Sequence, residues 1–221
     1  MNAPVGGCAV DHLVVAARTL DEGVAWCEAT LGITPTAGGQ HPLMGTHNRV
    51  FAIGSEAYPN AYFEIIAIDP DAPPPGRARW FALDETDLSA GPRLVHWVAR
   101  STQLDMHRWG LITVGHAPGN PLAASRETPQ GLLSWQILVR DDGRLECGGA
   151  LPTLIQWQGR HPAEALPPSG LVLKSLALAG VPARSATVLR LRGVAVSSAP
   201  GTPITAVLQT PKGEVTLEST R

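Results

Sequence analysis

The spacing of apolar residues changes near the start of the chain, from that of a strand to that of a helix. The run DHLVVAA (11–17) predicts a strand, and residues 18–32 show helical spacing of apolar side chains. Thr19 with Glu22 three residues later is a typical helix start, and Gly32 is a typical helix end. Three short strands are expected after this helix, at 34–38, 47–54 and 61–69.

The same order of elements recurs after a proline-rich break at 70–79. A strand at 93–101 and a short helix at 104–111 are followed by strands expected at 121–128, 132–139 and 151–158. Alignment of His12 with His96 places Leu20-Asp21 on Leu104-Asp105, and it brings Glu64 and Gln156 to the last strands of the two units. The pattern therefore predicts a repeat of strand, helix and three strands.

A third segment follows the linker 161–170. It predicts a strand, a helix at 182–192, a further strand and a final hairpin with Lys212-Gly213 at its turn. The expected class is α+β, with paired βαβββ modules at 8–70 and 93–160 that form a cupped, barrel-like mixed sheet. Residues 170–221 are expected to form a truncated third module packed on the second.

Composition and charge exclude several classes of protein. Hydrophobic residues make up 44% and charged residues 16%, and no apolar run reaches the roughly 18 residues of a membrane span. The net charge is −2 with scattered basic residues, which argues against nucleic acid as a partner. The start of the chain lacks a basic region followed by an apolar run, which predicts a cytoplasmic protein. Three widely spaced cysteines do not form a disulfide framework.

Histidines and a carboxylate in strands are the main chemical candidates. If the strands curl into a half-barrel, His12 and Glu64 converge on its concave side, with His96 and Gln156 in the matching positions of the second unit. Imidazole and carboxylate suit a divalent Zn, Ni, Fe or Mn ion. The alternatives are a hydrogen-bonded core histidine for His12 or His96 and a solvent-facing carboxylate for Glu64. Gln156, a poor ligand, could instead donate to a substrate.

The segment GGQHPLMGTHN (38–48) offers His41, His47 and Asn48 as substrate-binding residues near the expected pocket, and a polar hairpin loop is its alternative. Arg126 is a candidate for binding a substrate carboxylate, although a surface arginine is the more common case. Three other histidines have no counterpart in the repeat and are expected at the surface: His107, His116 and His161.

A resemblance to a known family rests on the stretches DHLVVAARTLDEGVAWCEATLGITPTAGGQHPLMGTHN and AYFEIIAIDPDAP. They resemble the glyoxalase-like domain family of the vicinal oxygen chelate superfamily, across 10–70 and more weakly across 93–158. The resemblance implies a metal in the cleft of a cupped sheet. In superfamily members such as glyoxalase I, the ligands come from the first and last strands of each module. Those positions here are His12, Glu64, His96 and Gln156.

The amide of Gln156 departs from glyoxalase I, where a carboxylate at this place also moves the substrate proton. Proton transfer is then expected from Glu64 or from a histidine of the 41–47 segment, with His47 as the candidate. The leading hypothesis is a metal-dependent lyase or isomerase that polarises a small oxygenated substrate.

Two other functions remain open from the sequence. One is a non-catalytic protein that binds or sequesters a small molecule, in which a pocket lined by tryptophans and apolar side chains holds the ligand. The other is an extradiol-type dioxygenase with His12, His96 and Glu64 as the iron ligands. A small-molecule substrate is the expected partner in each case, and the one protein partner expected is a second copy of the chain, as a homodimer.

Overall fold

A computed structural model describes residues 6–219 of the chain. The first module contains β1 (Ala9–Ala16), α1 (Leu20–Leu31), β2 (Thr36–His41), β3 (Thr46–Ala52) and β4 (Tyr62–Ile68). The second contains β5 (Arg93–Arg100), α2 (Leu104–Thr113), β6 (Asn120–Thr128), β7 (Gly131–Val139) and β8 (Thr153–Gln158). The third contains β9 (Val172–Leu178), α3 (Ala183–Leu189), β10 (Val194–Val196), β11 (Ile204–Thr210) and β12 (Gly213–Glu218). The predicted sequence of elements is confirmed throughout the described chain.

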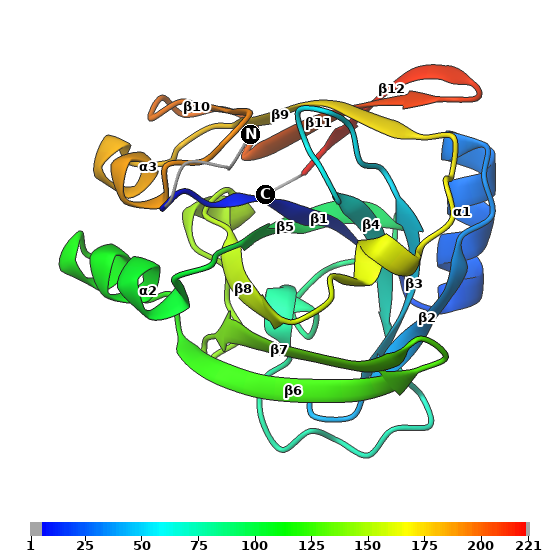
Figure 1. The fold of residues 1–221 in the computed structure, drawn as a ribbon. Helices are drawn as coiled ribbons and strands as arrows, with labels where there is room; N and C mark the ends of the chain where they lie inside the picture. The colour runs from blue at the N-terminus through cyan, green and yellow to red at the C-terminus, as the bar shows by residue number, and fades with distance from the viewer. Residues whose placement is uncertain (1–5, 220–221) are drawn as a thin grey trace.

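The first two modules share one cupped sheet of eight strands, in the order β2-β3-β4-β1-β5-β8-β7-β6. In each module the first and last strands pair in parallel, and β1 and β5 join the modules as an antiparallel pair. Figure 1 shows the sheet curling around an interior, with β6 and β7 along the bottom and α1 at one side. The predicted pair of βαβββ modules is therefore confirmed.

The strand register confirms the repeat and corrects its end. His12 pairs with Val98, and Val14 pairs with His96, so a shift of 84 residues (96 minus 12, and 98 minus 14) exchanges the two pairs. Beside them, Val14 pairs with Glu64, and the corresponding Val98 pairs with Thr153. His96 is thus the counterpart of His12, but the counterpart of Glu64 is Thr153.

Helix α1 has the two ends that its sequence predicts. The Thr19 hydroxyl accepts a hydrogen bond from the Glu22 amide at 3.2 Å, which satisfies one of the free amides of the first turn. Gly32 ends the helix in the left-handed region, with φ 78°. Gly23 lets the helix approach β4, because a Cβ there would lie 2.3 Å from the Ile65 side chain.

The larger core lies on the convex face of the eight-stranded sheet. Leu13, Phe63 and Trp97 point to this side and pack with α1, α2 and the strands of the third segment. A second apolar cluster, with Val14 and Val98 in the same strands, lines the concave face. Strand β1 is covered on both faces, which explains its continuous run of buried residues.

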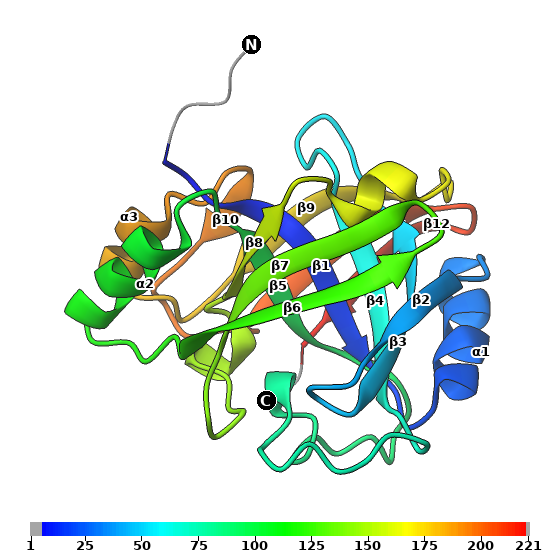
Figure 2. The same cartoon turned by 60° about the horizontal axis from the view of Figure 1, so that its bottom comes forward.

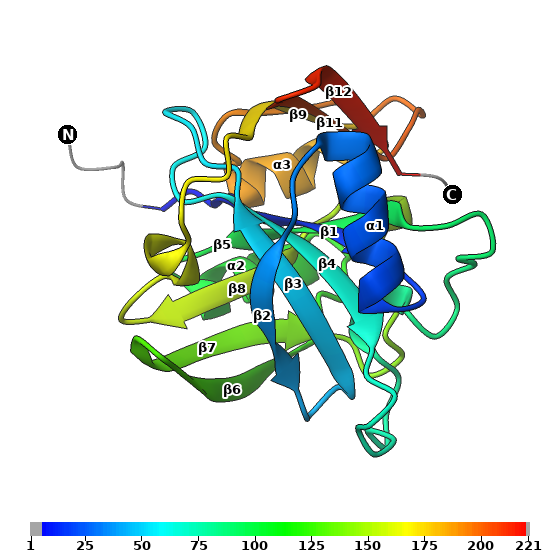
Figure 3. The same cartoon turned by 90° about the vertical axis from the view of Figure 1, so that its right-hand side faces the viewer.

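The third segment forms a separate four-stranded sheet in the order β10-β9-β11-β12. Its elements follow the βαβββ order in full, but β9 pairs with β10 in parallel and with β11 in antiparallel, unlike the first two modules. It contacts both of those modules: Lys212 Nζ donates to the Glu28 carbonyl of α1 at 2.9 Å, and α3 lies against α2. Figure 3 shows β12 beside α1. Residues 220–221 of the predicted segment lie outside the described residues.

The linker between the modules runs along the concave side of the eight-stranded sheet. Its short 3-10 turn, Trp80–Ala82, buries Trp80 and Phe81 in the concave apolar cluster. Phe81 and Ala82 have positive φ angles of 58° and 54°, a region that side chains other than glycine rarely adopt. This turn carries aromatic rings into the space between the two modules.

Candidate functional site

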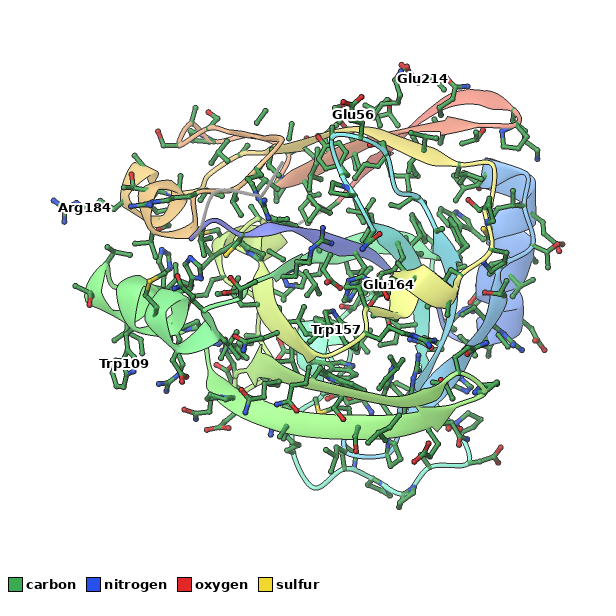
Figure 4. The ribbon with its side chains drawn as sticks, viewed as in Figure 1. Glu56, Trp109, Trp157, Glu164, Arg184 and Glu214 are labelled. Atoms are coloured by element: carbon green, nitrogen blue, oxygen red, sulfur yellow. The ribbon has the colours of Figure 1, made fainter. Side chains whose placement is uncertain are left out.

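A cavity of about 750 Å³ opens on the concave side of the sheet. Aromatic rings form much of its wall, from Tyr62, Trp80, Phe81, Trp135 and Trp157. Polar side chains converge on it from several strands: His12, His41, Asn48, Glu64 and Arg126. In Figure 4, Trp157 lies inside the curve of the sheet, whereas Trp109 on α2 points outward. The size and the mixture of aromatic and polar groups are those of a small-molecule site.

The imidazole of His12 lies between two carboxylates. Its Nδ1 donates to Asp11 Oδ1 at 2.7 Å, and its Nε2 is 3.5 Å from Glu64 Oε2. The ring is 4% exposed and stacks on Tyr62, with 4.5 Å between the ring centroids. These contacts fix the orientation of the ring, and they leave Nε2 facing Glu64 and the cavity.

Asp11 reaches this side of the sheet because β1 is irregular there. The register with β5 shifts between Val10 and His12, so Asp11 is an extra residue whose side chain is re-aimed. Besides His12, its carboxylate accepts hydrogen bonds from Trp157 Nε1 and His161 Nε2, each at 2.9 Å. Asp11 is 0% exposed, so these three donors replace the water that the buried charge has lost.

Glu64 is held from its other side by Asn48. Asn48 Nδ2 donates to Glu64 Oε1 at 2.6 Å and lies 3.4 Å from His41 Nε2, while Asn48 Oδ1 accepts from the Gly39 amide at 2.7 Å. Every polar atom of the Asn48 side chain is therefore used inside the protein. A series of polar contacts therefore links His41 through Asn48 and Glu64 to His12.

The pKa values of these linked side chains are shifted in opposite directions. Burial lowers the pKa of His12, but the hydrogen bonds to Asp11 and Glu64 outweigh it and raise the pKa to about 9. Burial raises the pKa of both carboxyl groups, yet their partners hold each below its usual range. Burial lowers the pKa of His41 to about 4. At neutral pH the site therefore holds a cationic His12 between two anions, beside a neutral His41.

His96 does not join this site, contrary to the metal-ligand prediction. Its Nδ1 donates to the Gly149 carbonyl and its Nε2 accepts from the Thr153 amide, each at 3.0 Å. Burial lowers its pKa to about 3. Phe81 packs on its ring at 5.4 Å and stands at the border of the cavity. The hydrogen-bonded core histidine, which the sequence left open as the alternative, describes His96.

Gln156 points to the opposite face of β8, so its prediction as a ligand is wrong. Its Oε1 accepts a hydrogen bond from the amide of Leu104 at 2.9 Å, at the first turn of α2. The N-cap residue of that helix, Gln103, makes no side-chain hydrogen bond there, so Gln156 supplies the missing acceptor. The place that corresponds to Glu64 is taken by Thr153, whose side chain cannot act as a carboxylate.

His47 is also on the wrong face for the catalytic and substrate-binding roles that the sequence suggested. It alternates with Asn48 on β3, and its Nδ1 is 3.8 Å from Asp69 Oδ1, outside the cavity. Of the three side chains proposed from the 38–48 segment, His41 and Asn48 line the cavity. The alternative was a polar loop across the whole segment. Most of the segment lies instead in the paired strands β2 and β3, and the loop is confined to the turn between His41 and Thr46.

Arg126, a candidate for binding a substrate carboxylate, lines the cavity from β6. Its Nη1 is buried and has no hydrogen-bond partner among residues 6–219. The guanidinium lies over Gly39 of β2, since a Cβ on that glycine would be 2.0 Å from Nη1. Figure 2 shows β6 crossing the front of the sheet toward β2. The two edges of the sheet therefore meet at this arginine.

Asp11 and His161 were not predicted from the sequence. Regular alternation along a strand puts neighbouring residues on opposite faces, and the local irregularity that brings Asp11 to the side of His12 cannot be recognised in the sequence. His161 was expected at the surface but is 7% exposed; it accepts from the Ala163 amide through Nδ1 and donates to Asp11. The same expectation is wrong for His107, which is buried, and for His116, which is half-buried against Ser185.

The donor set does not fit the metal centre that the sequence predicts. Of the four expected ligands, His12 and Glu64 alone face one another. Zinc sites use three or four protein ligands, and the iron triad needs a second histidine. Within residues 6–219, no group of three His, Cys, Asp or Glu side chains is placed to hold a metal ion. The same reasoning removes the dioxygenase triad, because His96 is not available to it.

The raised pKa of His12 predicts how stability depends on pH. An unfolded histidine titrates near 6.5, whereas folded His12 titrates near 9, so its stabilising charge is fully present below 6.5 and is lost as the pH rises to 9. We expect the free energy of unfolding to fall across this window by up to about 3 kcal/mol. Denaturant unfolding at pH 6.5 and 9 measures this fall, which should shrink in His12→Gln. An equal fall in both proteins would contradict the assignment.

Comparisons with known proteins agree with this fold. Residues 10–194 match the family model described as a glyoxalase-like domain. The crystal structure of a hypothetical protein from Staphylococcus aureus is similar, with a TM-score of 0.57 and 15% identity over 97% of this chain and 87% of that one. A Streptomyces coelicolor methylmalonyl-CoA epimerase in complex with 2-nitronate-propionyl-CoA gives a TM-score of 0.42 and 14% identity, over 67% of this chain and 92% of that one.

No curated protein matches the chain. No helix within residues 6–219 is long and apolar enough to cross a membrane. The family model covers most of the chain, including both modules of the cupped sheet and the start of the third segment. The chain therefore belongs to the glyoxalase-like domain family.

Proposed function

We propose that the protein is an enzyme that moves a proton at a carbon atom next to a carbonyl group of a small substrate. The observation that carries this proposal is the placement of cationic His12 against the Glu64 carboxylate at the wall of the cavity. Ionised groups are costly to bury, and this cluster lies in a cavity wall rather than in a core. Perturbed acids and bases that converge on one cavity are typical of catalytic sites.

The two residues have complementary roles in this reaction. Glu64 Oε2 takes the proton from the carbon, and the electron pair of the C–H bond moves to the carbonyl oxygen as an enolate. His12 Nε2–H donates a hydrogen bond, and then its proton, to that oxygen. Transfer of the Glu64 proton to a different carbon of the enol, while His12 recovers its proton from the enol oxygen, completes an isomerisation. Departure of a group from the neighbouring carbon with the Glu64 proton, as His12 recovers its own and the carbonyl forms again, gives a lyase reaction.

The separation of 3.5 Å between His12 Nε2 and Glu64 Oε2 suits this division of roles. It is longer than a charge-assisted hydrogen bond, so a substrate carbonyl can take the Nε2 proton without breaking a strong contact. When the Nε2–H of His12 donates to the substrate, its contact with Glu64 weakens, so it lowers the pKa of Glu64 less and Glu64 becomes a stronger base. Binding of the substrate thus prepares the base.

Asp11 and His161 position this pair without contacting the substrate. Asp11 fixes the Nδ1–H tautomer of His12 and stabilises its charge, as the buried carboxylate does in other acid–base sites. His161 begins the short turn Pro162–Ala165, which borders the cavity, and its hydrogen bond holds this turn to Asp11. The wall of the cavity and the acid–base pair are therefore fixed through one carboxylate.

A metal-free mechanism follows from the donor set, and it replaces the metal-dependent one expected from the sequence. With His96 and Gln156 engaged elsewhere, two ligands remain for a divalent ion. We expect protein purified without chelator to carry well below one equivalent of Zn, Ni, Fe or Mn by elemental analysis. A full equivalent that disappears in both His12→Ala and Glu64→Ala would overturn the metal-free mechanism.

Deuterium exchange at carbon tests the proposed reaction on a whole class of substrates at once. A panel of small carbonyl compounds with acidic C–H bonds is incubated with the protein in D₂O and followed by NMR. We expect exchange with at least one compound, and a rate at least about a hundredfold lower in Glu64→Gln, because the amide cannot accept the proton. Glu56→Gln is the control and should keep the rate, because Glu56 is exposed and does not line the cavity. Exchange that is unchanged in Glu64→Gln would refute the role of this residue.

Non-catalytic binding of a small molecule is the second candidate, and the aromatic lining of the cavity favours it. Trp135 and Trp157 stand 5.4 Å apart and present flat apolar surface to a ligand. This function predicts tight binding that survives the loss of both His12 and Glu64, with no deuterium exchange in any compound. The exchange experiment therefore separates the two functions.

A further inference from the structure

Arg126 lies in the wall of the cavity, and the proposed reaction does not use its charge. It extends from β6, the edge strand, where it pairs with Leu133 of β7. Its Nη1 has almost no contact with solvent and no acceptor within residues 6–219. A buried guanidinium N–H that lacks an acceptor is costly, so its place in a cavity points to an acceptor that arrives with a ligand.

The two carboxylates of the acid–base cluster are already engaged by other donors. Glu64 accepts from Asn48 and faces His12, and Asp11 accepts from His12, Trp157 and His161. Arg126 still affects side chains of the same cavity. Its positive charge lowers the pKa of His41 and opposes the rise in the pKa of Tyr62. The guanidinium therefore lies in the electrostatic field of the acid–base pair without neutralising it.

Two glycines in β2 make the room that this arrangement needs. A Cβ at Gly39 would lie 2.0 Å from Arg126 Nη1 and 2.8 Å from its Cζ. A Cβ at Gly38 would lie 2.1 Å from Asn48 Oδ1. The register of β2 with β3 is irregular between Ala37 and Gln40, where this pair lies. The Gly38-Gly39 pair thus admits both Asn48 and Arg126 to the cavity.

We propose that Arg126 anchors a carboxylate of the substrate, and that Gly39 is the residue that permits this binding position. The guanidinium presents two parallel N–H donors, which match a carboxylate in a bidentate pair. The aromatic walls from Trp135 and Trp157 fit a flat apolar body next to that carboxylate. The substrate class is an aromatic or similarly flat carboxylic acid. The inference rests on the proposed function in one respect, the placement of the reacting carbon at Glu64.

Binding of two analogues of equal size, one charged and one neutral, tests the anchor. 3-Phenylpropionate and 3-phenylpropionamide are titrated into the full chain by calorimetry at pH 7.5. We expect the acid to bind about ten- to a hundredfold more tightly than the amide, as a charge-assisted hydrogen bond provides. Arg126→Gln should bring the two affinities together, while Arg126→Lys should keep part of the preference.

Two further variants separate the anchor from general effects. Arg160→Gln is the matched control, because Arg160 also lines the cavity but donates to the Gln130 carbonyl, and it should keep the preference. Gly39→Ala keeps every charge but displaces the end of the flexible Arg126 side chain, and it should weaken the acid by at least about tenfold. Thermal unfolding of each variant is measured as well, and an unchanged midpoint temperature shows that the variant is folded.

The outcomes distinguish this inference from the proposed function. An acid preference in the native chain that Arg126→Gln removes supports the anchor, whether or not deuterium exchange is seen. Equal affinities for acid and amide in the native chain, or a preference that survives Arg126→Gln, would overturn it. Loss of the preference in Arg160→Gln alone would move the anchor to that residue. If Glu64→Gln abolishes deuterium exchange but the native chain shows no preference for the acid, the proposed function is supported and the anchor is refuted.

Discussion

The buried carboxylate of Asp11 is the interaction on which the site depends. It is removed from solvent and accepts hydrogen bonds from His12 on β1, Trp157 on β8 and His161 in the following turn. These donors come from both modules and from the segment that leads to the third. A charge in this position is stable because each donor is itself fixed by the fold. The same carboxylate keeps His12 cationic, so the packing of three segments and the chemistry of the cavity depend on one group.

The two modules are related by a repeat, yet they are chemically unequal. The shift that exchanges His12 with His96 also exchanges Glu64 with Thr153. In the second module both ring nitrogens of the histidine are used by the backbone, and Phe81 from the linker covers its ring. The acid–base pair therefore lies in the first module, and the second module has no counterpart of it among the described residues. The aromatic turn that separates the modules also provides part of the wall of the cavity.

The local spacing of residues in the sequence was enough to predict the strands, the helices and the repeat. The ends of α1 could be predicted because Thr19 and Gly32 act within one turn of their own helix. His12 and Glu64 could be paired because β1 and β4 lie in an unbroken parallel register from His12 onward. Gln156 was misplaced because identity in the last strand is low, so the alignment slipped by three residues from Thr153. Asp11 and His161 could not be found, since an irregularity in β1 and contacts across about 150 positions are products of the tertiary fold.

The central claim is that His12 is an imidazolium ion held between Asp11 and Glu64. Selective ¹⁵N labelling of histidine and NMR at pH 7.5 tests it directly, with His12→Gln to assign the signal. The account predicts that both ring nitrogens of His12 carry protons at this pH and that the ring titrates near pH 9. A neutral His12 ring at pH 7.5, with a bare Nε2, would contradict it.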